Sequence, residues 1–299
     1  QIETNLSLSG SNADKRIVIK PSEQKVLLSD LYSSLSSGSD PKDKRLLEIV
    51  KKLKSNKGRS IIVCDSNDKE NQLIVNGINA FLGNYDQTMS MAMPSYIRQG
   101  NTAKVNSLIK QMSNNEIGAL ITYKVNPVYN LHNAKDFSNA LSKVPLTISS
   151  SLYNDETASL MEYVCPDNHN LESWGDAHPS YNTYSLMQPT IAPLFSTRQF
   201  EDTLLKWSDG SDYNSFLSEF WKKRGVNWAK AVHDGSFNIE DRKSKVSSIA
   251  KLNKNVLSFE ISNTNKIELA LYEKIGIGDG TQANNPWLQE LPDPISRAC

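Results

Sequence analysis

Apolar residues recur at helical spacing in several stretches of the chain, and polar or glycine residues follow them. In residues 43–55, five apolar residues fall on one helical face, and Asn56-Lys57-Gly58 supplies a stop signal. The same reasoning predicts helices over 27–36, 68–82, 102–112, 134–141, 198–207 and 212–224.

Short apolar runs alternate with these helices in the middle of the chain. They predict strands over 60–64, 117–123, 145–149 and 163–165. Strands that alternate with helices favour parallel βαβ units, so we expect an α/β fold built on a parallel, doubly wound, Rossmann-like sheet. Ligands of such sheets lie beyond the carboxyl ends of the strands. Three segments occupy those positions: Asp65–Asp68, Lys124–Tyr129 and Ser149–Asp155.

The remaining segments have weaker patterns. Residues 1–27 predict a strand or hairpin, and 166–199, rich in proline, asparagine and serine, predict a long irregular loop. A helix over Val246–Leu252 and strands over Val256–Ile261 and Ile267–Tyr272 precede an irregular C-terminal portion. We therefore expect three domains: 1–58 packing on the core, 59–207 as the α/β lobe with its long loop, and 208–299 as a truncated helical and strand portion.

Composition narrows the function classes. The 299 residues include 33 basic and 33 acidic ones, which gives no overall electrostatic argument for nucleic acid or an anionic membrane. Lys51, Lys52, Lys54 and Lys57 are interpreted as the solvated face of a helix. Mean hydropathy is −0.48, and no apolar run is long enough for a membrane span.

Three cysteines without CxxC spacing exclude a four-thiolate iron–sulfur cluster within this chain. Because the chain starts at Gln1 without an initiator methionine and stops soon after Pro294, we expect it to be a portion of a longer protein.

The densest polar cluster consists of side chains that all bind transition metals: Cys165, Asp167, His169, Glu172, Asp176 and His178. Their spacing matches no standard zinc motif, so a loop bonded to its own backbone is favoured over a structural metal. No GxSxG nucleophile motif or Walker sequence is present, and Gly276–Gly280 does not match GxGxxG.

Two local features each allow two interpretations. Asn126-Pro127 follows a predicted strand, where a nucleotide could meet backbone amides, but a plain turn explains it locally and is favoured. Asp155-Glu156-Thr157 opens a short helix, where a carboxylate either caps the helix or reaches a ligand. Capping is favoured because it needs no partner.

A set of weak motifs in a consistent order resembles the molybdopterin oxidoreductase superfamily, which includes formate dehydrogenase and DMSO reductase. The segments are Asn79–Asn84 (N-x-x-L-G-N), Gly118–Ile121 with Asn126–Tyr129, Glu156–Ala158, Tyr163–Pro166 with Leu171-Glu172, and Asn285–Pro294. Glu172–Asp176 and Gln188–Ile191 resemble more narrowly the iron–sulfur subunit of bacterial alternative complex III, a hydrogenase-like homologue branch. The ordered matches cover most of the chain.

The resemblance implies an α/β lobe that cradles half of a molybdenum bis-pterin guanine dinucleotide, with Asn126, Glu156 and Thr157 lining a vestigial nucleotide cleft. The chain departs from the family pattern, because Met161-Glu162 replaces an Ala-Asp pair and the cluster cysteines and molybdenum-ligand region are absent. The alternative complex III branch keeps the fold without molybdenum. We therefore expect no cofactor, metal or catalytic residue in this fragment, and iron–sulfur clusters in the missing portion.

The resemblance also implies a place and partners. We expect a scaffold within a quinol-oxidising electron-transfer complex on the periplasmic side of the bacterial inner membrane. Its partners would be the other subunits, without nucleic acid and without direct membrane insertion. Two alternatives stay open: part of an active molybdenum or tungsten oxidoreductase whose catalytic residues lie elsewhere, or a small-molecule binding module that uses the pterin cleft.

Overall fold

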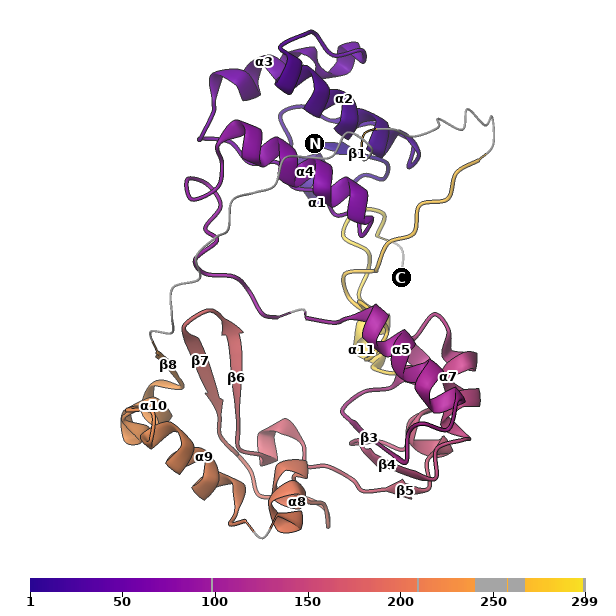
Figure 1. Cartoon of the computed structure of the whole chain (residues 1–299), viewed down its shortest axis with the longest axis vertical. Helices are drawn as coiled ribbons and strands as arrows, with labels where there is room; N and C mark the ends of the chain where they lie inside the picture. Colours follow the sequence, from indigo (N-terminus) through magenta and orange to yellow (C-terminus); the bar gives the residue numbers. More distant parts are fainter. Residues whose placement is uncertain (98, 209, 240–256, 258–266, 298–299) are drawn as a thin grey trace. The chain divides into compact units, whose positions relative to one another are not determined.

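The computed structural model describes residues 1–97, 99–208, 210–239, 257 and 267–297 (Figure 1). The chain divides into two compact units, one formed by 1–92 with 244–299 and the other by 93–243. The two units divide at residues 92 and 243, whereas the predicted domain limits are 58 and 207. The predicted limits concern domains that fold independently, so they stay predictions. No helix among the described residues is long and apolar enough to cross a membrane.

The first unit begins with two short strands. β1 (Ile2–Glu3) and β2 (Ile17–Val18) pair in parallel, with Ile2 opposite Ile17. The helical turn α1 (Leu8–Ser11) lies between them in sequence. Residues 1–27 were expected to form a strand or hairpin. Strands are present, but the hairpin alternative is wrong, because a hairpin would make the two strands antiparallel.

Three helices build the core of this unit: α2 (Glu23–Ser37), α3 (Leu47–Ser55) and α4 (Lys69–Leu82). A 3-10 turn, Lys44–Leu46, leads directly into α3. The core residues sit at the apolar positions that predicted the helices, and they include Leu27, Leu31, Leu35, Leu46, Val50, Leu53, Ile74, Ile78 and Leu82. Asp68 caps α4 by accepting hydrogen bonds from the Glu70 and Asn71 amides. All three predicted helices are confirmed.

The predicted strand 60–64 is wrong, because this segment is irregular, and among the described residues its backbone bonds to side chains and not to a strand. Asn79, fully buried in α4, accepts a hydrogen bond from the Ile62 amide at 3.0 Å and donates one to the Ile62 carbonyl at 2.8 Å. Asn84 donates to the Asn79 side-chain oxygen at 2.9 Å. The Asn79–Asn84 motif thus positions the backbone that precedes α4.

The second unit contains the parallel sheet that the sequence predicts. Its strands, β3 (Ala119–Tyr123), β4 (Leu146–Ser150) and β5 (Tyr163–Val164), lie in that order. Their register sets Ile121 beside Ile148, and Ile148 beside Tyr163. The parallel α/β arrangement is confirmed, whereas the doubly wound, Rossmann-like form stays a prediction.

Two predicted helices pack against this sheet: α5 (Thr102–Ser113) and α7 (Ala134–Leu141). Their buried residues form one cluster, which Leu120 of β3 joins; the cluster includes Ile109, Met112, Phe137, Ala140, Leu141, Val144 and Met161. Met161, at the position where the chain departs from the family pattern, is therefore a core residue. Burial of each large side chain contributes roughly 1.5–3 kcal/mol.

The expected irregular loop 166–199 contains regular structure that the sequence pattern does not reveal. β6 (Gly175–Ser180) and β7 (Thr183–Met187) form an antiparallel pair, and β8 (Ser236–Asn238) extends it. Most of these residues are small or polar, so the apolar alternation of a strand is missing. Aromatic contacts hold the sheet instead: the ring of Tyr184 stacks on that of Phe237, with centroids 5.6 Å apart.

Helices α8 (Phe200–Trp207) and α9 (Tyr213–Lys222) confirm two predictions, and α10 (Trp228–Asp234) was not predicted. The predicted helix Val246–Leu252 lies outside the described residues, as does the predicted strand Val256–Ile261 apart from Leu257. The predicted strand Ile267–Tyr272 is wrong, because this segment is irregular and its apolar side chains are exposed. One further turn, α11 (Pro286–Gln289), interrupts an otherwise irregular C-terminal portion.

The Asn79 amide offers a test of how the segment around Ile62 is held. Asn79→Ala removes partners from two backbone groups of Ile62 and from Asn84, so we expect a loss of roughly 2–4 kcal/mol in the free energy of unfolding. Urea denaturation measures it. Asn76→Ala, which removes only an exposed hydrogen bond from the Tyr85 hydroxyl at 3.2 Å, is the matched control. Equal effects of the two substitutions would contradict this role of Asn79.

Candidate functional site

The carboxyl ends of β3 and β4 bring together the three residues expected to line a nucleotide cleft. The Asn126 side-chain oxygen accepts hydrogen bonds from the Thr157 hydroxyl at 2.7 Å and from the Thr157 amide at 3.2 Å. The Asn126 side-chain nitrogen donates to Glu156 Oε2 at 2.6 Å. The prediction that Asn126, Glu156 and Thr157 lie close together therefore agrees with the geometry, while their role as cofactor ligands stays a prediction.

Local chemistry explains the position of Asn126. Pro127 occupies the first turn of α6 (Pro127–Asn130), where its missing N–H costs nothing. The amides of Tyr129 and Asn130 donate to the Asn126 carbonyl at 3.1 and 2.9 Å. The favoured interpretation of Asn126-Pro127 as a turn is confirmed.

Asp155 shapes the other side of the site. Its Oδ1 accepts hydrogen bonds from the Thr157 and Ala158 amides at 3.1 and 2.8 Å, directly before the 3-10 turn Ala158–Leu160. The capping interpretation of this carboxylate is confirmed. Capping by Asp155 leaves the neighbouring Glu156 side chain exposed, where among the described residues it accepts a side-chain hydrogen bond from Asn126.

The bonding within this trio decides what it could hold. Thr157 is fully buried, and its hydroxyl also accepts a hydrogen bond from the Val128 amide at 3.0 Å, so it lies out of reach of a ligand. The trio presents one exposed carboxylate and one remaining amide hydrogen of Asn126. Because a carboxylate repels a phosphate, the three residues do not fit the pyrophosphate of a dinucleotide cofactor.

The cation of this loop is also paired. Lys124 has a left-handed backbone (φ 51°), and its Nζ lies 3.2 Å from Asp167 Oδ2 and 3.3 Å from Asn170 Oδ1. The Asp167 side chain is buried, and its Oδ1 accepts a hydrogen bond from the Phe200 amide at 2.9 Å. Lys124 thus compensates the charge of a buried carboxylate, since such a charge needs a partner.

A second carboxylate, the half-buried Glu201, meets the last residue of β3. The Tyr123 hydroxyl donates to Glu201 Oε1 at 2.8 Å, and the Tyr123 ring stacks on Phe200 with centroids 4.7 Å apart. Burial raises the pKa of Tyr123 above its ordinary value, and the hydrogen bond to Glu201 adds to the shift. The phenol is therefore neutral and serves as a hydrogen-bond donor. The sequence contains no signal for this pair, because the two residues lie 78 positions apart.

The residues of the possible metal cluster have separate local roles. His169 and Glu172 cap the 3-10 turn Asn170–Glu172, and the Trp221 indole donates to Asp176 at 2.9 Å. His178 stacks on Tyr184, with ring centroids 4.2 Å apart. Within the residues that the structure describes, no group of three or more such side chains could hold a metal ion. The favoured interpretation, a loop bonded to its own surroundings, agrees with this geometry.

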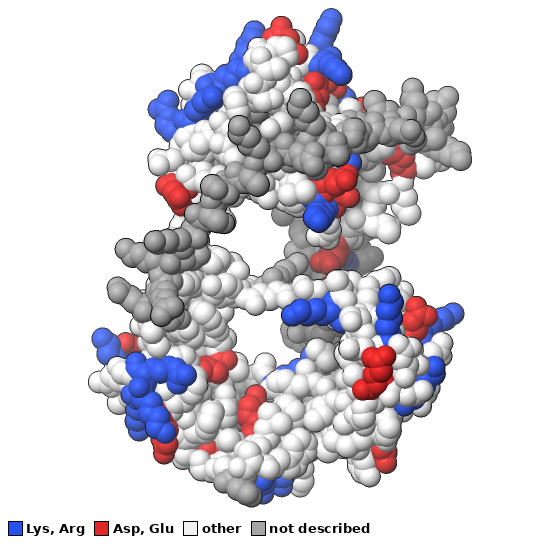
Figure 2. Space-filling model, in the orientation of Figure 1, with Lys and Arg blue, Asp and Glu red and all other residues white. Residues whose placement is uncertain are grey.

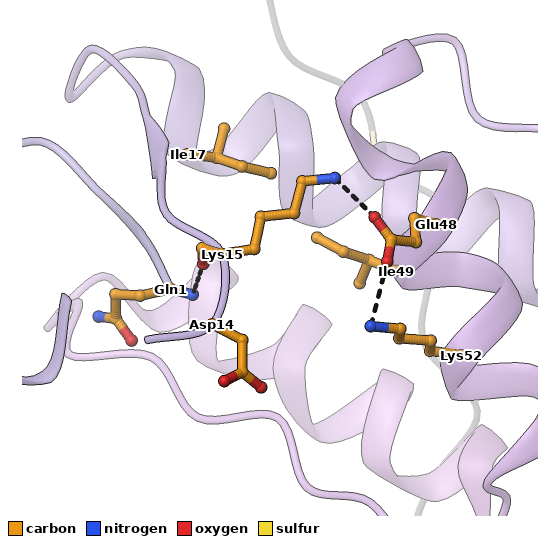
Figure 3. Close-up of a pocket in the computed structure, with 7 residues that line it drawn as sticks. All are labelled: Gln1, Asp14, Lys15, Ile17, Glu48, Ile49 and Lys52. Atoms are coloured by element: carbon orange, nitrogen blue, oxygen red, sulfur yellow. Dashed lines mark hydrogen bonds and ion pairs between the residues drawn. The ribbon is translucent and has the colours of Figure 1, made fainter. Parts of the chain in front are cut away.

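Two shallow cavities of about 230 and 240 Å³ stand out, both in the first unit. Gln1, Asp14, Lys15, Ile17, Glu48, Ile49 and Lys52 line the first, shown in Figure 3. Gly276 and Pro292–Pro294 contribute to the second. Neither is lined by Asn126, Glu156 or Thr157, so neither adds volume to the strand-end site.

The Asn126 side chain can be removed to test the strand-end network. Asn126→Ala leaves the buried Thr157 hydroxyl without its acceptor, so we expect a loss of roughly 1–3 kcal/mol in the free energy of unfolding, measured by urea denaturation. Asn130→Ala, exposed in the same turn, should change stability by less than about 0.5 kcal/mol. A wild-type stability for Asn126→Ala would show that the network is not formed.

Glu156 reports the same network by its titration. The hydrogen bond from Asn126 lowers the pKa of Glu156 below its ordinary value. A lowered folded-state pKa stabilises above the unfolded-state pKa, and this contribution is lost as pH falls through the folded-state value. In Asn126→Ala the Glu156 pKa should rise towards its ordinary value in a carbon-13 NMR titration. An unchanged Glu156 pKa would contradict the pairing.

Comparison with known proteins places this geometry in context. No protein-family model matches the chain. A 91-residue stretch is 36% identical to the menaquinone reductase, molybdopterin-binding-like subunit of Nitratidesulfovibrio vulgaris; it covers 29% of this chain and 13% of that protein. Acetylene hydratase from Pelobacter acetylenicus aligns with a TM-score of 0.41 at 14% identity, over 45% of this chain and 20% of that one.

The sequence match agrees with the resemblance at the level of the molybdopterin superfamily and does not extend to a particular complex. Because the matched stretch spans only 13% of the relative, the activity and partners of that whole protein are not those of this chain by similarity alone.

Proposed function

We propose that this chain is part of a molybdopterin-oxidoreductase-like subunit in a membrane-bound, quinone-linked electron-transfer complex. In this proposal it is a scaffold that positions partner subunits and has no redox centre of its own. We further propose that the subunit lies on the periplasmic side of the membrane, as in alternative complex III. The 36% identity to a menaquinone reductase subunit supports the quinone-linked setting.

One observation carries the scaffold role: the side chains at the carboxyl ends of β3 and β4 bond to one another. Asn126 accepts hydrogen bonds from the Thr157 amide and hydroxyl and donates one to Glu156. Lys124 forms an ion pair with Asp167. A site prepared for a dinucleotide would offer unpaired donors to its phosphates. Here the polar groups stabilise the fold, so the parallel sheet works as a rigid element.

Metal and pterin content of the intact complex tests this proposal. We expect molybdenum and tungsten far below one atom per polypeptide by mass spectrometry, and no fluorescence of oxidised pterin after acid extraction. Stoichiometric metal with pterin fluorescence would contradict the scaffold role. It would instead favour an active molybdenum or tungsten enzyme.

A substitution at Glu156 tests the scaffold role by a second measurement, the electron-transfer activity of the complex. Glu156→Gln keeps the shape of the side chain and removes its charge. Under the proposal, quinone-linked electron transfer by the intact complex is unchanged, as it should be for the control Glu162→Gln at a nearby exposed position. Loss of electron transfer in Glu156→Gln alone would assign a cofactor or substrate to this edge of the sheet.

A further inference from the structure

Helix α3 and its flanks concentrate positive charge in a chain that is neutral overall. Residues 44–59 contain seven Lys or Arg and one acidic residue, Glu48, so their net charge is +6 (7 minus 1). The whole chain sums to zero, so the other residues together carry −6. Figure 2 shows Lys and Arg side chains gathered over the α3 region. We call Lys44, Lys51, Lys52, Lys57 and Arg59 the basic surface.

The packing of α3 directs these cations outward. Val50 and Leu53 are buried in the core of the first unit, so the opposite stripe of the helix faces solvent. Lys51 and Lys52 lie on that stripe and are exposed, as are the other members of the basic surface. The interpretation as a solvated helical face is confirmed for Lys51 and Lys52. It is wrong for Lys54, which is half-buried and donates to the Gly38 carbonyl, and for Lys57, which lies beyond the end of α3.

The single acidic residue in this region is already neutralised. Figure 3 shows Glu48 between Lys15 and Lys52, with N–O distances of 2.8 and 3.1 Å. These two lysines lower the pKa of Glu48 to about 2. In the described part of the chain, Lys44, Lys51 and Arg59 have no ion-pair partner within 4.0 Å. The charges of Lys44, Lys51 and Arg59 are therefore available to a partner.

Exposed aliphatic side chains follow the basic surface directly in sequence. Ile61 is 50% exposed and Val63 is 78% exposed, in the irregular segment after Arg59. Asn79 holds the backbone of this segment at Ile62, so Ile61 and Val63 are presented on a fixed frame.

We propose that the basic surface, with Ile61 and Val63, docks on an anionic phospholipid bilayer. Clusters of four to eight cations on an amphipathic helix bind acidic headgroups, and adjacent apolar side chains reach the acyl boundary. Single-stranded nucleic acid fits less well, because it needs exposed aromatic rings on which bases stack. The nearby Phe81 ring is covered by Lys57, whose Nζ lies 4.2 Å from the ring centroid. The choice of a bilayer rests on the proposed function, which sets the chain beside a membrane.

Vesicle sedimentation with the intact polypeptide tests the docking. We expect binding to vesicles of phosphatidylglycerol mixed with phosphatidylcholine, no binding to phosphatidylcholine alone, and release by salt. Lys44→Glu/Lys51→Glu/Arg59→Glu should weaken partitioning by about tenfold or more. Lys104→Glu/Lys110→Glu/Lys135→Glu, the same charge change at exposed positions of the second unit, should retain binding.

The aliphatic pair has its own variant. Ile61→Ser/Val63→Ser should weaken vesicle binding without changing its preference for phosphatidylglycerol. Leu194→Ser/Phe195→Ser removes equally exposed apolar side chains elsewhere and should have no effect. Circular dichroism of each variant confirms that it is folded.

Three outcomes would overturn the proposal: no preference for phosphatidylglycerol, equal losses in the two charge-reversal variants, or tighter binding to duplex DNA than to vesicles. Vesicle binding does not depend on molybdenum or pterin content. Failure here therefore leaves the proposed function intact, and stoichiometric metal would leave the docking intact.

Discussion

Asparagine side chains satisfy polar groups that the secondary structure of this protein leaves unpaired. Asn79 pairs with both backbone groups of Ile62, and Asn126 accepts from the hydroxyl and the amide of Thr157. An amide suits both places because it donates and accepts at once. A buried polar group without a partner costs as much as several such bonds contribute, so both arrangements depend on these two residues.

The same constraint links the fold to the proposed function. At the end of β3, Tyr123 donates to Glu201 Oε1 and Lys124 pairs with Asp167, while Asp167 Oδ2 and Glu201 Oε2 are buried and accept no hydrogen bond from the described residues. A parallel sheet exposes its ligand-binding edge at the carboxyl ends of its strands. Here that edge is stabilised by its own side chains. Under the proposed function, this edge contributes rigidity to the fold.

The sequence predicts the elements that are held by contacts between residues near one another in the chain, and it misses those held by contacts between distant residues. Helices α4 and α5 were predicted because their apolar period and caps are local, and β3 and β4 because each is a short apolar run. β6 and β7 were missed because residues such as His178 are held by aromatic contacts and not by an apolar face. The segment 60–64 looked like a strand, since its residue types suit one, but its pairing partner is a side chain in α4.

The candidate site divides in the same way. The resemblance to molybdopterin oxidoreductases implied that Asn126, Glu156 and Thr157 line one cleft, and only Asn126 also belongs to a strand-end segment predicted from the sequence pattern. Their mutual pairing could not be predicted, because it depends on the register of β3 and β4. The partnership of Tyr123 with Glu201 joins elements that no local pattern connects.

The strand-end site is closed by its own hydrogen bonds. This closure can be tested by titrating the intact protein with guanosine diphosphate and with a pterin. NMR follows the Asn126 side chain and the Val128 and Thr157 amides during the titration. We expect these resonances to stay unchanged across the titration. A saturable shift of these resonances at one ligand per chain would contradict this closure.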